Sequence, residues 1–212
     1  MRNKKNILVS FILMLVPLAI GAFFYSKMPE QLPTHFGLDG NPDKFSSKAV
    51  ALFQMPIIMV GVQLIMVFML NKDPRKKYQS EKLYIISLFI IPILTIMISS
   101  LTVAYGMGSK VEINRIIIVA ISLLFVVMGN FLPKSKRNYT MGIKNPWTLS
   151  SDVIWEKTHR LGGYTFVISG IVGIVFGLVL KNSAFAILML IMAAGIIPTV
   201  YSYILYEREN KQ

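Results

Sequence analysis

The sequence predicts an all-α membrane protein, a polytopic bundle of six transmembrane helices. Three observations predict this class: 54% of the 212 residues are hydrophobic, only 15% are charged, and the mean hydropathy is +0.60. Soluble domains carry roughly 25% charged residues, and they cannot bury this much apolar surface. The composition therefore excludes a soluble enzyme. Because the chain has no cysteine, it also excludes disulfides, thiolate metal sites and a cysteine nucleophile.

The six spans are apolar stretches of 18 to 25 residues, the length that crosses a bilayer as a helix. None contains Asp, Glu, Lys, Arg or His, so all 32 charged residues lie outside them. The predicted spans are residues 7–26, 49–70, 83–107, 116–133, 162–180 and 184–206. The first follows a basic segment, but it is too long for a cleaved signal peptide and lacks a small-residue cleavage site, so we expect it to be retained.

The basic residues predict the orientation. With the N-terminus in the cytoplasm, 16 Lys and Arg residues lie inside and 6 outside, which agrees with the positive-inside rule. Both termini are therefore predicted to be cytoplasmic, and the inner face carries about +10 of the net charge of +12. Membrane topology accounts for the basic charge, so we expect no direct binding of nucleic acid.

Two loops divide the chain into two predicted domains. Residues 1–82 form a two-span domain with an ordered outer loop, and residues 83–212 form a four-span domain with a long inner loop, residues 129–163. In the fifth span Ser169, Gly173 and Gly177 recur every four residues. We expect this small-residue ridge to pack against a neighbouring helix of the same chain rather than a dimer partner.

The outer loop, residues 27–48, contains turn-forming pairs. Asp39-Gly40 and Asn41-Pro42 lie between two short segments, which predicts a small hairpin. Asp39, Asn41 and Asp43 alternate as in a calcium loop. The glycine is second instead of sixth, however, and Val50 occupies the place of the required glutamate, so a turn with solvated carboxylates is favoured over a calcium site.

The inner loop is predicted to contain a short amphipathic helix. Ser150 or Ser151 can cap it, with Asp152 in its first turn facing the positive end of the helix dipole. Asp152, Trp155, Glu156 and His159 are three or four residues apart, so we expect them to share a face. Apolar neighbours predict that this helix lies at the membrane surface.

The sequence predicts no catalytic residues, metal site or cofactor. Glu156 and His159 form a single Glu-x-x-His, whereas di-iron bundles use two such pairs, and the only other histidine, His35, lies across the membrane. The spans offer no base to activate a serine and no ionisable residue to couple transport; their best polar candidates are Gln63 and Asn130. A binding or sensing protein is favoured. The alternatives are a permease for small solutes or lipids and, third, a membrane enzyme using Glu156.

The two loops together resemble the SdpI-type immunity protein family of bacteria. The inner-loop residues that carry the resemblance are Gly129-Asn130, Pro133-Lys134, Asn138, Gly142-Ile143, Pro146-Trp147-Thr148-Leu149, Trp155, Lys157-Thr158-His159-Arg160 and Gly162-Gly163. The outer-loop residues Leu32, Pro33, His35, Phe36, Gly40, Asp43 and Lys48 resemble the uncharacterised N-terminal domain that accompanies this family. Asn145 before Pro146 is a small departure from the pattern.

The resemblance implies a multi-pass protein of the bacterial plasma membrane without enzymatic activity. The best-understood family member protects its cell from a secreted peptide toxin that collapses the proton-motive force. It also acts as a receptor that holds a soluble autorepressor at the membrane. The implied partners are therefore the lipid bilayer, a secreted peptide toxin and a repressor protein on the cytoplasmic face.

The resemblance also implies the binding and signalling residues. In the inner loop these are Asn130, Pro133, Lys134, Asn138, Gly142, Pro146, Trp147, Thr148, Trp155, Thr158, His159 and Arg160, and in the outer loop Pro33, His35, Phe36, Gly40, Asp43 and Lys48. One hypothesis is that Trp147, Trp155 and His159 form an inner switch surface; the alternative is that both tryptophans only anchor the loop at the interface. His159 could sense cytoplasmic acidification, or it could be an ordinary solvated histidine.

Overall fold

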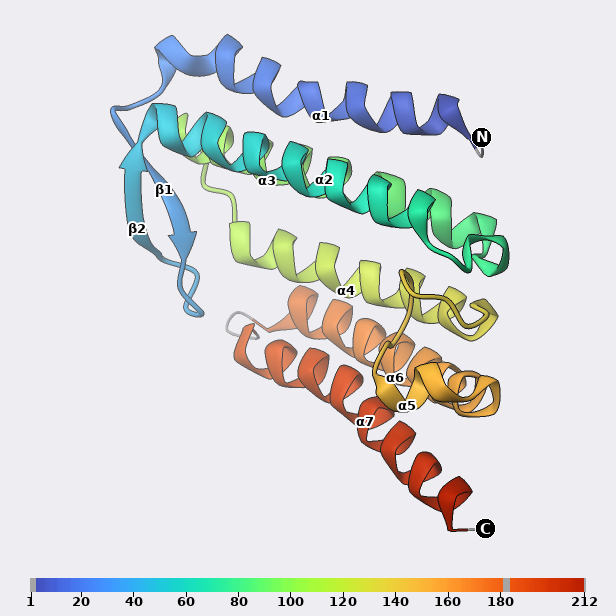
Figure 1. Cartoon of the computed structure of the whole chain (residues 1–212). Helices are drawn as coiled ribbons and strands as arrows, with labels where there is room; N and C mark the ends of the chain where they lie inside the picture. The colour runs from blue at the N-terminus through green and yellow to red at the C-terminus, as the bar shows by residue number, and fades with distance from the viewer. Residues whose placement is uncertain (1–2, 181–183, 212) are drawn as a thin grey trace. The chain divides into compact units, whose positions relative to one another are not determined.

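The computed structural model describes residues 3–180 and 184–211. Within these residues, six helices are long and apolar enough to cross a membrane, which confirms the predicted class (Figure 1). They are α1 (Lys4–Phe24), α2 (Met55–Lys72), α3 (Glu81–Gly106), α4 (Ile113–Phe131), α6 (Asp152–Val179) and α7 (Ala184–Asn210), with a π-helical segment, Val50–Gln54, preceding α2. The orientation of the termini stays a prediction.

One helix differs from its prediction. The expected short surface helix before the fifth span is the first part of α6, which runs unbroken from Asp152 to Val179. Ser151 is its N-cap, and the Ser151 hydroxyl accepts a hydrogen bond from the Ile154 amide at 3.4 Å. The Gly162-Gly163 pair does not end the helix. Both glycines keep the helical conformation and pack closely against their neighbours. A separate five-residue helix, α5 (Pro146–Ser150), lies in the loop before it.

The chain folds into two compact units. The first comprises Met1–Met69 and Ile85–Ile113, and the second comprises Leu70–Tyr84 and Asn114–Gln212. The first three spans thus share a unit, whereas the domain boundary predicted at residue 82 separates the third span from the first two. The short connection between α2 and α3 belongs to the second unit.

In the first unit, a buried amide joins three helices. Gln63 on α2 is fully buried, and its Nε2 donates to the Ser10 hydroxyl of α1 and to the Leu88 carbonyl of α3, both at 3.0 Å. Gln63 is thus an interhelical hydrogen-bonding residue. A polar side chain placed this way fixes the helices' register in an apolar environment.

The predicted outer hairpin is present. Strands β1 (Gln31–Phe36) and β2 (Pro42–Ser47) pair antiparallel, and Gly40 in the turn between them has φ 88°, which glycine adopts readily. Leu32 on β1 is fully buried and packs with Met28, Leu52 and Val103. This apolar cluster fixes the hairpin to the ends of the first unit's helices.

In the second unit, small residues bring α4 and α6 together. A side chain added at Gly173 would collide with Ser122, and one added at Gly177 would lie within 2.7 Å of Ile118. The third member of the ridge, Ser169, donates its hydroxyl proton to the Leu190 carbonyl of α7 at 3.2 Å. The ridge therefore packs within the chain, as predicted.

Candidate functional site

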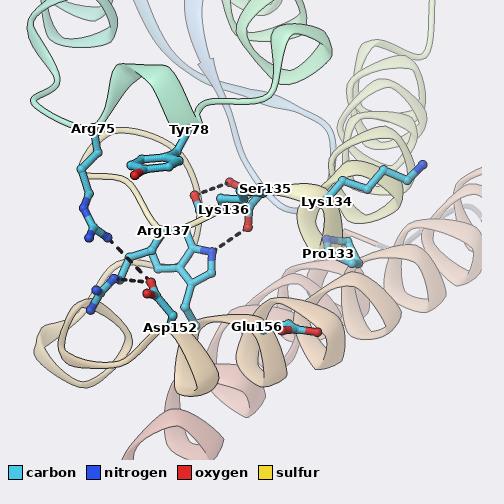
Figure 2. A pocket seen from close by; sticks show the side chains of 10 residues that line it. Arg75, Tyr78, Pro133, Lys134, Ser135, Lys136, Arg137, Asp152 and Glu156 are labelled. Carbon is cyan, nitrogen blue, oxygen red and sulfur yellow. Dashed lines mark hydrogen bonds and ion pairs between the residues drawn. The ribbon is translucent and has the colours of Figure 1, made fainter.

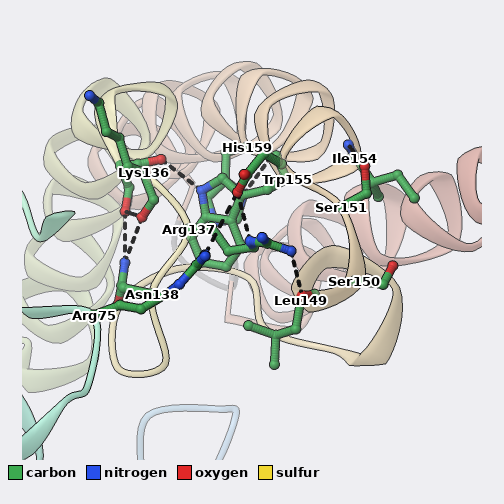
Figure 3. A network of polar contacts seen from close by, with 12 residues as sticks. Arg75, Lys136, Arg137, Asn138, Leu149, Ser150, Ser151, Ile154, Trp155 and His159 are labelled. Atoms are coloured by element: carbon green, nitrogen blue, oxygen red, sulfur yellow. Dashed lines mark hydrogen bonds and ion pairs between the residues drawn. The ribbon is translucent and has the colours of Figure 1, made fainter.

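The candidate site is built by residues 132–151, which we call the long loop, together with the first turns of α6 (Figure 3). The Trp155 and His159 rings stack with their centroids 3.9 Å apart, one helical turn from each other. Both side chains are buried, with 2% and 0% exposure. The Trp155 indole N–H donates to the Ser135 carbonyl at 2.7 Å. We expected Asp152, Trp155, Glu156 and His159 to share one face of the helix. In the structure Trp155 and His159 are buried, whereas Asp152 and Glu156 are exposed.

The ring nitrogens of His159 bond to two parts of the backbone. Nδ1 lies 2.8 Å from the Trp155 carbonyl, to which it donates, and Nε2 accepts from the Ile143 amide at 3.0 Å. This pattern requires the neutral ring with its proton on Nδ1. Gly142, the residue before Ile143, has φ 115°, and a side chain there would collide with the His159 ring. The motif Gly142-Ile143 thus allows the loop backbone to approach the histidine.

Asn138 organises the start of the long loop. It is fully buried, and its Oδ1 accepts hydrogen bonds from the Thr140 and Met141 amides at 3.0 and 2.7 Å. Its Nδ2 donates to the carbonyls of Lys136 and Met141 at 2.9 and 3.1 Å. An asparagine that satisfies surrounding backbone groups in this way closes a turn by itself.

The motif around Pro146 forms a capping box. The Asn145 side chain accepts from the Thr148 amide at 2.8 Å, and the buried Thr148 hydroxyl accepts from the Asn145 amide at 3.0 Å. Asn145 also donates to the Ser202 hydroxyl on α7 at 2.9 Å, and the Trp147 ring packs 5.1 Å from that of Tyr203. Trp147 therefore anchors the loop to α7, and Asn145 has a clear structural function.

A second loop is bound to the long loop. We call residues 70–84, which run from the last turn of α2 to the first turn of α3, the basic loop. Its buried Asp73 accepts hydrogen bonds from the Tyr139 amide at 3.0 Å and the Thr140 hydroxyl at 2.7 Å. It also accepts from the Arg75 amide at 2.7 Å and the Gln79 amide group at 3.2 Å. Burial opposes ionisation, but these hydrogen bonds outweigh it and hold the pKa of Asp73 below its ordinary value.

Two arginines share one carboxylate beside this junction. The Arg137 Nε lies 2.6 Å from the Asp152 Oδ1, and the Arg75 Nη1 lies 3.7 Å from the same oxygen. Arg137 also donates to the Leu149 carbonyl at 2.8 Å. A cavity of about 430 Å³ opens next to them, with the basic loop, the start of the long loop and the start of α6 around it (Figure 2).

The other inner residues implied by the resemblance lie around this core. Asn130, Lys134 and Arg160 are exposed, and Pro133 contacts Gly163 across the α4–α6 junction. Thr158 is fully buried, and its hydroxyl has no hydrogen-bond partner among the described residues. The structure therefore brings most of the inner residues into one folded network, with the exposed ones at its edge.

The outer residues form a second, more open group on the hairpin. The His35 Nδ1 lies 2.6 Å from the Asp43 Oδ1, and both side chains are about half exposed. Phe36 packs edge-on against Tyr105, Lys48 pairs with Glu30 at 2.9 Å, and Pro33 is buried on β1. Asn41 donates to both carboxylate oxygens of Asp39, as expected for a turn, and no group of three metal-ligating side chains occurs in residues 3–180 or 184–211.

Sequence reasoning missed Asp73, Arg75 and Arg137. Asp73 had a usable signal, because it is the only acid in the segment Asn71–Tyr78, which is otherwise strongly basic, and it precedes a proline. Its partners in the long loop are 66 and 67 residues away in the sequence. No local pattern identifies them.

Comparisons with known proteins agree with the resemblance. Residues 134–202 match the SdpI/YfhL protein family, and residues 12–60 match a domain of unknown function, DUF1648. The chain is 25% identical to the "Immunity protein SdpI" of Bacillus subtilis (strain 168) over 98% of each chain. An uncharacterized protein of Archaeoglobus fulgidus is 33% identical over 30% of this chain and 33% of its own. No solved structure matches the chain.

Proposed function

We propose that the chain is a membrane immunity protein of the SdpI/YfhL type, which protects a bacterium from a secreted, membrane-active peptide toxin. The observation that carries this proposal is similarity to an immunity protein over 98% of both chains, which includes both loops and all six spans. The proposed activity is binding and sensing, without catalysis or a cofactor.

We assign toxin interception to the hairpin. Its tip and second strand carry two large apolar side chains in solvent, Leu38 and Phe45, which are 56% and 50% exposed. Next to them lies the polar pair His35 and Asp43. An apolar peptide approaching the outer membrane surface would meet exposed apolar side chains with polar groups beside them, a combination suited to binding an amphipathic segment.

We assign signalling to the opposite membrane face. The long loop and the hairpin are separated by an odd number of spans, so they lie on opposite sides of the membrane. A soluble repressor would dock on the exposed cations of the long loop and the start of α6, including Lys134, Lys144 and Arg160. In this proposal Trp155 and His159 hold the shape of the docking surface from within, because neither side chain is accessible.

The test is a membrane-potential assay in toxin-sensitive bacteria that lack their own immunity gene. The peptide is added to cells with and without this protein, and a voltage-sensitive dye reports depolarisation. We expect cells with the protein to keep their potential. Depolarisation of both cultures, with the protein detected in the membrane, would overturn the proposal for that toxin.

A variant pair tests the hairpin assignment. Phe45→Ser removes an exposed apolar side chain from β2, and Val153→Ser removes a comparably exposed one, at 51%, from the start of α6. We expect Phe45→Ser to weaken protection at unchanged membrane abundance, and Val153→Ser to retain it. Equal protection by both variants would contradict toxin binding at the hairpin.

A further inference from the structure

We propose that the cavity between the basic loop, the start of the long loop and the start of α6 binds the phosphate headgroup of an anionic phospholipid. The cavity is about 430 Å³, which is within the range of small-molecule sites. The inference concerns the second unit alone, and it does not depend on the proposed immunity function.

The charge of the cavity lining favours an anion. Four basic side chains contribute to it, from Arg75, Lys134, Lys136 and Arg137, against two acidic ones, from Asp152 and Glu156. Asp152 is shared by two arginines, and its distance to Arg75, 3.7 Å, exceeds that of a hydrogen bond. Two guanidinium groups beside one carboxylate leave an uncompensated positive charge at the cavity. A phosphate oxygen would complete this arrangement through charge-assisted hydrogen bonds.

The geometry in Figure 2 distinguishes the members of the lining. Arg75 and Arg137 converge on Asp152, whereas the Lys134 side chain extends away from them. The Lys134 ammonium lies 5.2 Å from the Phe131 ring centre. Lys134 is therefore not included. Arg137 is already bound to Asp152 and to the Leu149 carbonyl, so of the basic lining residues we assign Arg75 and Lys136 to the anion.

The position of the cavity along the chain indicates a lipid instead of a soluble phosphate. Pro133 and Lys134 are the last residues of the fourth span, Trp155 lies in the first turns of the helix that forms the fifth, and Arg75 lies between the second and third spans. The two connections that these residues belong to lie on one side of the membrane, because an even number of spans separates them. The rings of Tyr78 and Trp155 contribute to the lining. Aromatic and basic side chains together are typical of the headgroup depth of a bilayer.

The experiment measures lipid retention by the purified full-length protein. Protein in detergent is supplied with a mixture of phosphatidylglycerol and phosphatidylcholine, and native mass spectrometry reports which lipid stays bound. We compare wild type with Arg75→Gln/Lys136→Gln. The matched control is Lys82→Gln/Lys144→Gln, which removes two exposed cations from the same two loops without altering the cavity lining.

We expect wild type and the control to retain phosphatidylglycerol preferentially. The cavity variant should lose about five-fold in retention for each removed charge, the value of a basic residue close to anionic lipid. Equal losses in both double variants would overturn the site, because they would show attraction spread over the surface. If the double variant has a lower unfolding temperature than wild type, the single variant Lys136→Gln gives the same test, because it changes an exposed side chain.

A second arm distinguishes the source of the phosphate. Soluble glycerol 3-phosphate is added in excess over the bound lipid. The proposal requires that it does not displace phosphatidylglycerol, since the acyl chains hold the lipid in the bilayer or micelle. Displacement at similar concentrations would overturn the lipid assignment in favour of a soluble phosphate compound.

Discussion

The long loop and the hairpin both carry the residues by which the family is recognised, but they use them differently. In the long loop Asn138, Thr148 and His159 have no exposed surface, and each bonds to backbone groups of its own region. On the hairpin His35 and Asp43 are half exposed and pair with each other. The buried residues Asn138, Thr148 and His159 therefore maintain the shape of the long loop, whereas His35 and Asp43 on the hairpin are accessible to a partner. Substitutions should separate these two classes.

The largest effect is expected at Trp155. Trp155→Ala removes a buried indole, leaves a cavity beside His159 and deprives the Ser135 carbonyl of its donor. We expect a loss of about 3–5 kcal/mol in the free energy of unfolding and reduced membrane abundance. Thermal unfolding in detergent measures it, with Tyr139→Ala, an exposed aromatic of the same loop, as control. If protection is lost while the unfolding temperature is unchanged, Trp155 acts directly on a partner.

Next in size is Asp73→Asn. The replacement presents an amide N–H₂ group to a site where every neighbour donates a proton. We expect a destabilisation of about 1–3 kcal/mol, because one donor in a buried site loses its acceptor. Glu81→Gln, at an exposed position beside the same loop, is the matched control and should be neutral. Equal unfolding temperatures for both variants would show that the contact between the two loops adds nothing to stability.

Gly142→Ala should have a comparable or smaller effect. The residue has φ 115°, and the added carbon would collide with the His159 ring. Strain of this kind costs about 1–3 kcal/mol. Gly61→Ala, in α2 with open space around the added carbon, should be within about 0.5 kcal/mol of wild type. Unfolding temperatures of the two variants give the comparison directly.

The stabilisation from Asp73 should also depend on pH. Its pKa in the folded protein lies below the ordinary value of 3.8, so the unfolded chain binds the proton more readily. The contribution is therefore complete above pH 3.8 and lost as the pH falls through the lower folded value. Unfolding temperatures measured from pH 6 downward should converge for wild type and Asp73→Asn below that range. A constant difference between them would contradict this linkage.

The smallest structural effect is expected on the hairpin. His35→Ala removes one member of an exposed pair, which contributes about 0–1 kcal/mol. The unfolding temperature should stay close to that of wild type, while protection against the toxin should fall if the hairpin binds it. A large loss of stability would place His35 with the long-loop residues and remove the contrast between the two regions.

The features that sequence predicted well depend on local chemistry. The spans follow from the exclusion of charge from lipid, and the hairpin follows from Asp39-Gly40 and Asn41-Pro42. Two features depend on distant contacts, and sequence did not predict them. The unbroken α6 requires knowledge of how Gly162-Gly163 packs, and the role of Asp73 requires partners more than 60 residues away. The resemblance implied the site residues, but not that five of the inner ones, Asn138, Thr148, Trp155, Thr158 and His159, are buried.

The place of the basic loop has a consequence for how such proteins are assembled and recombined. Asp73 is encoded with the first two spans, yet its hydrogen bonds are made to a loop that follows the fourth. A chimera that exchanged residues 1–82 between two relatives would therefore bring a foreign acceptor to the long loop. Splitting the gene at the same point would leave the second fragment without a buried part of its own fold. A boundary before residue 70 would keep the basic loop with its partner, but it would separate α3 from the first two spans of its unit. Any single boundary in this region therefore divides one of the two units.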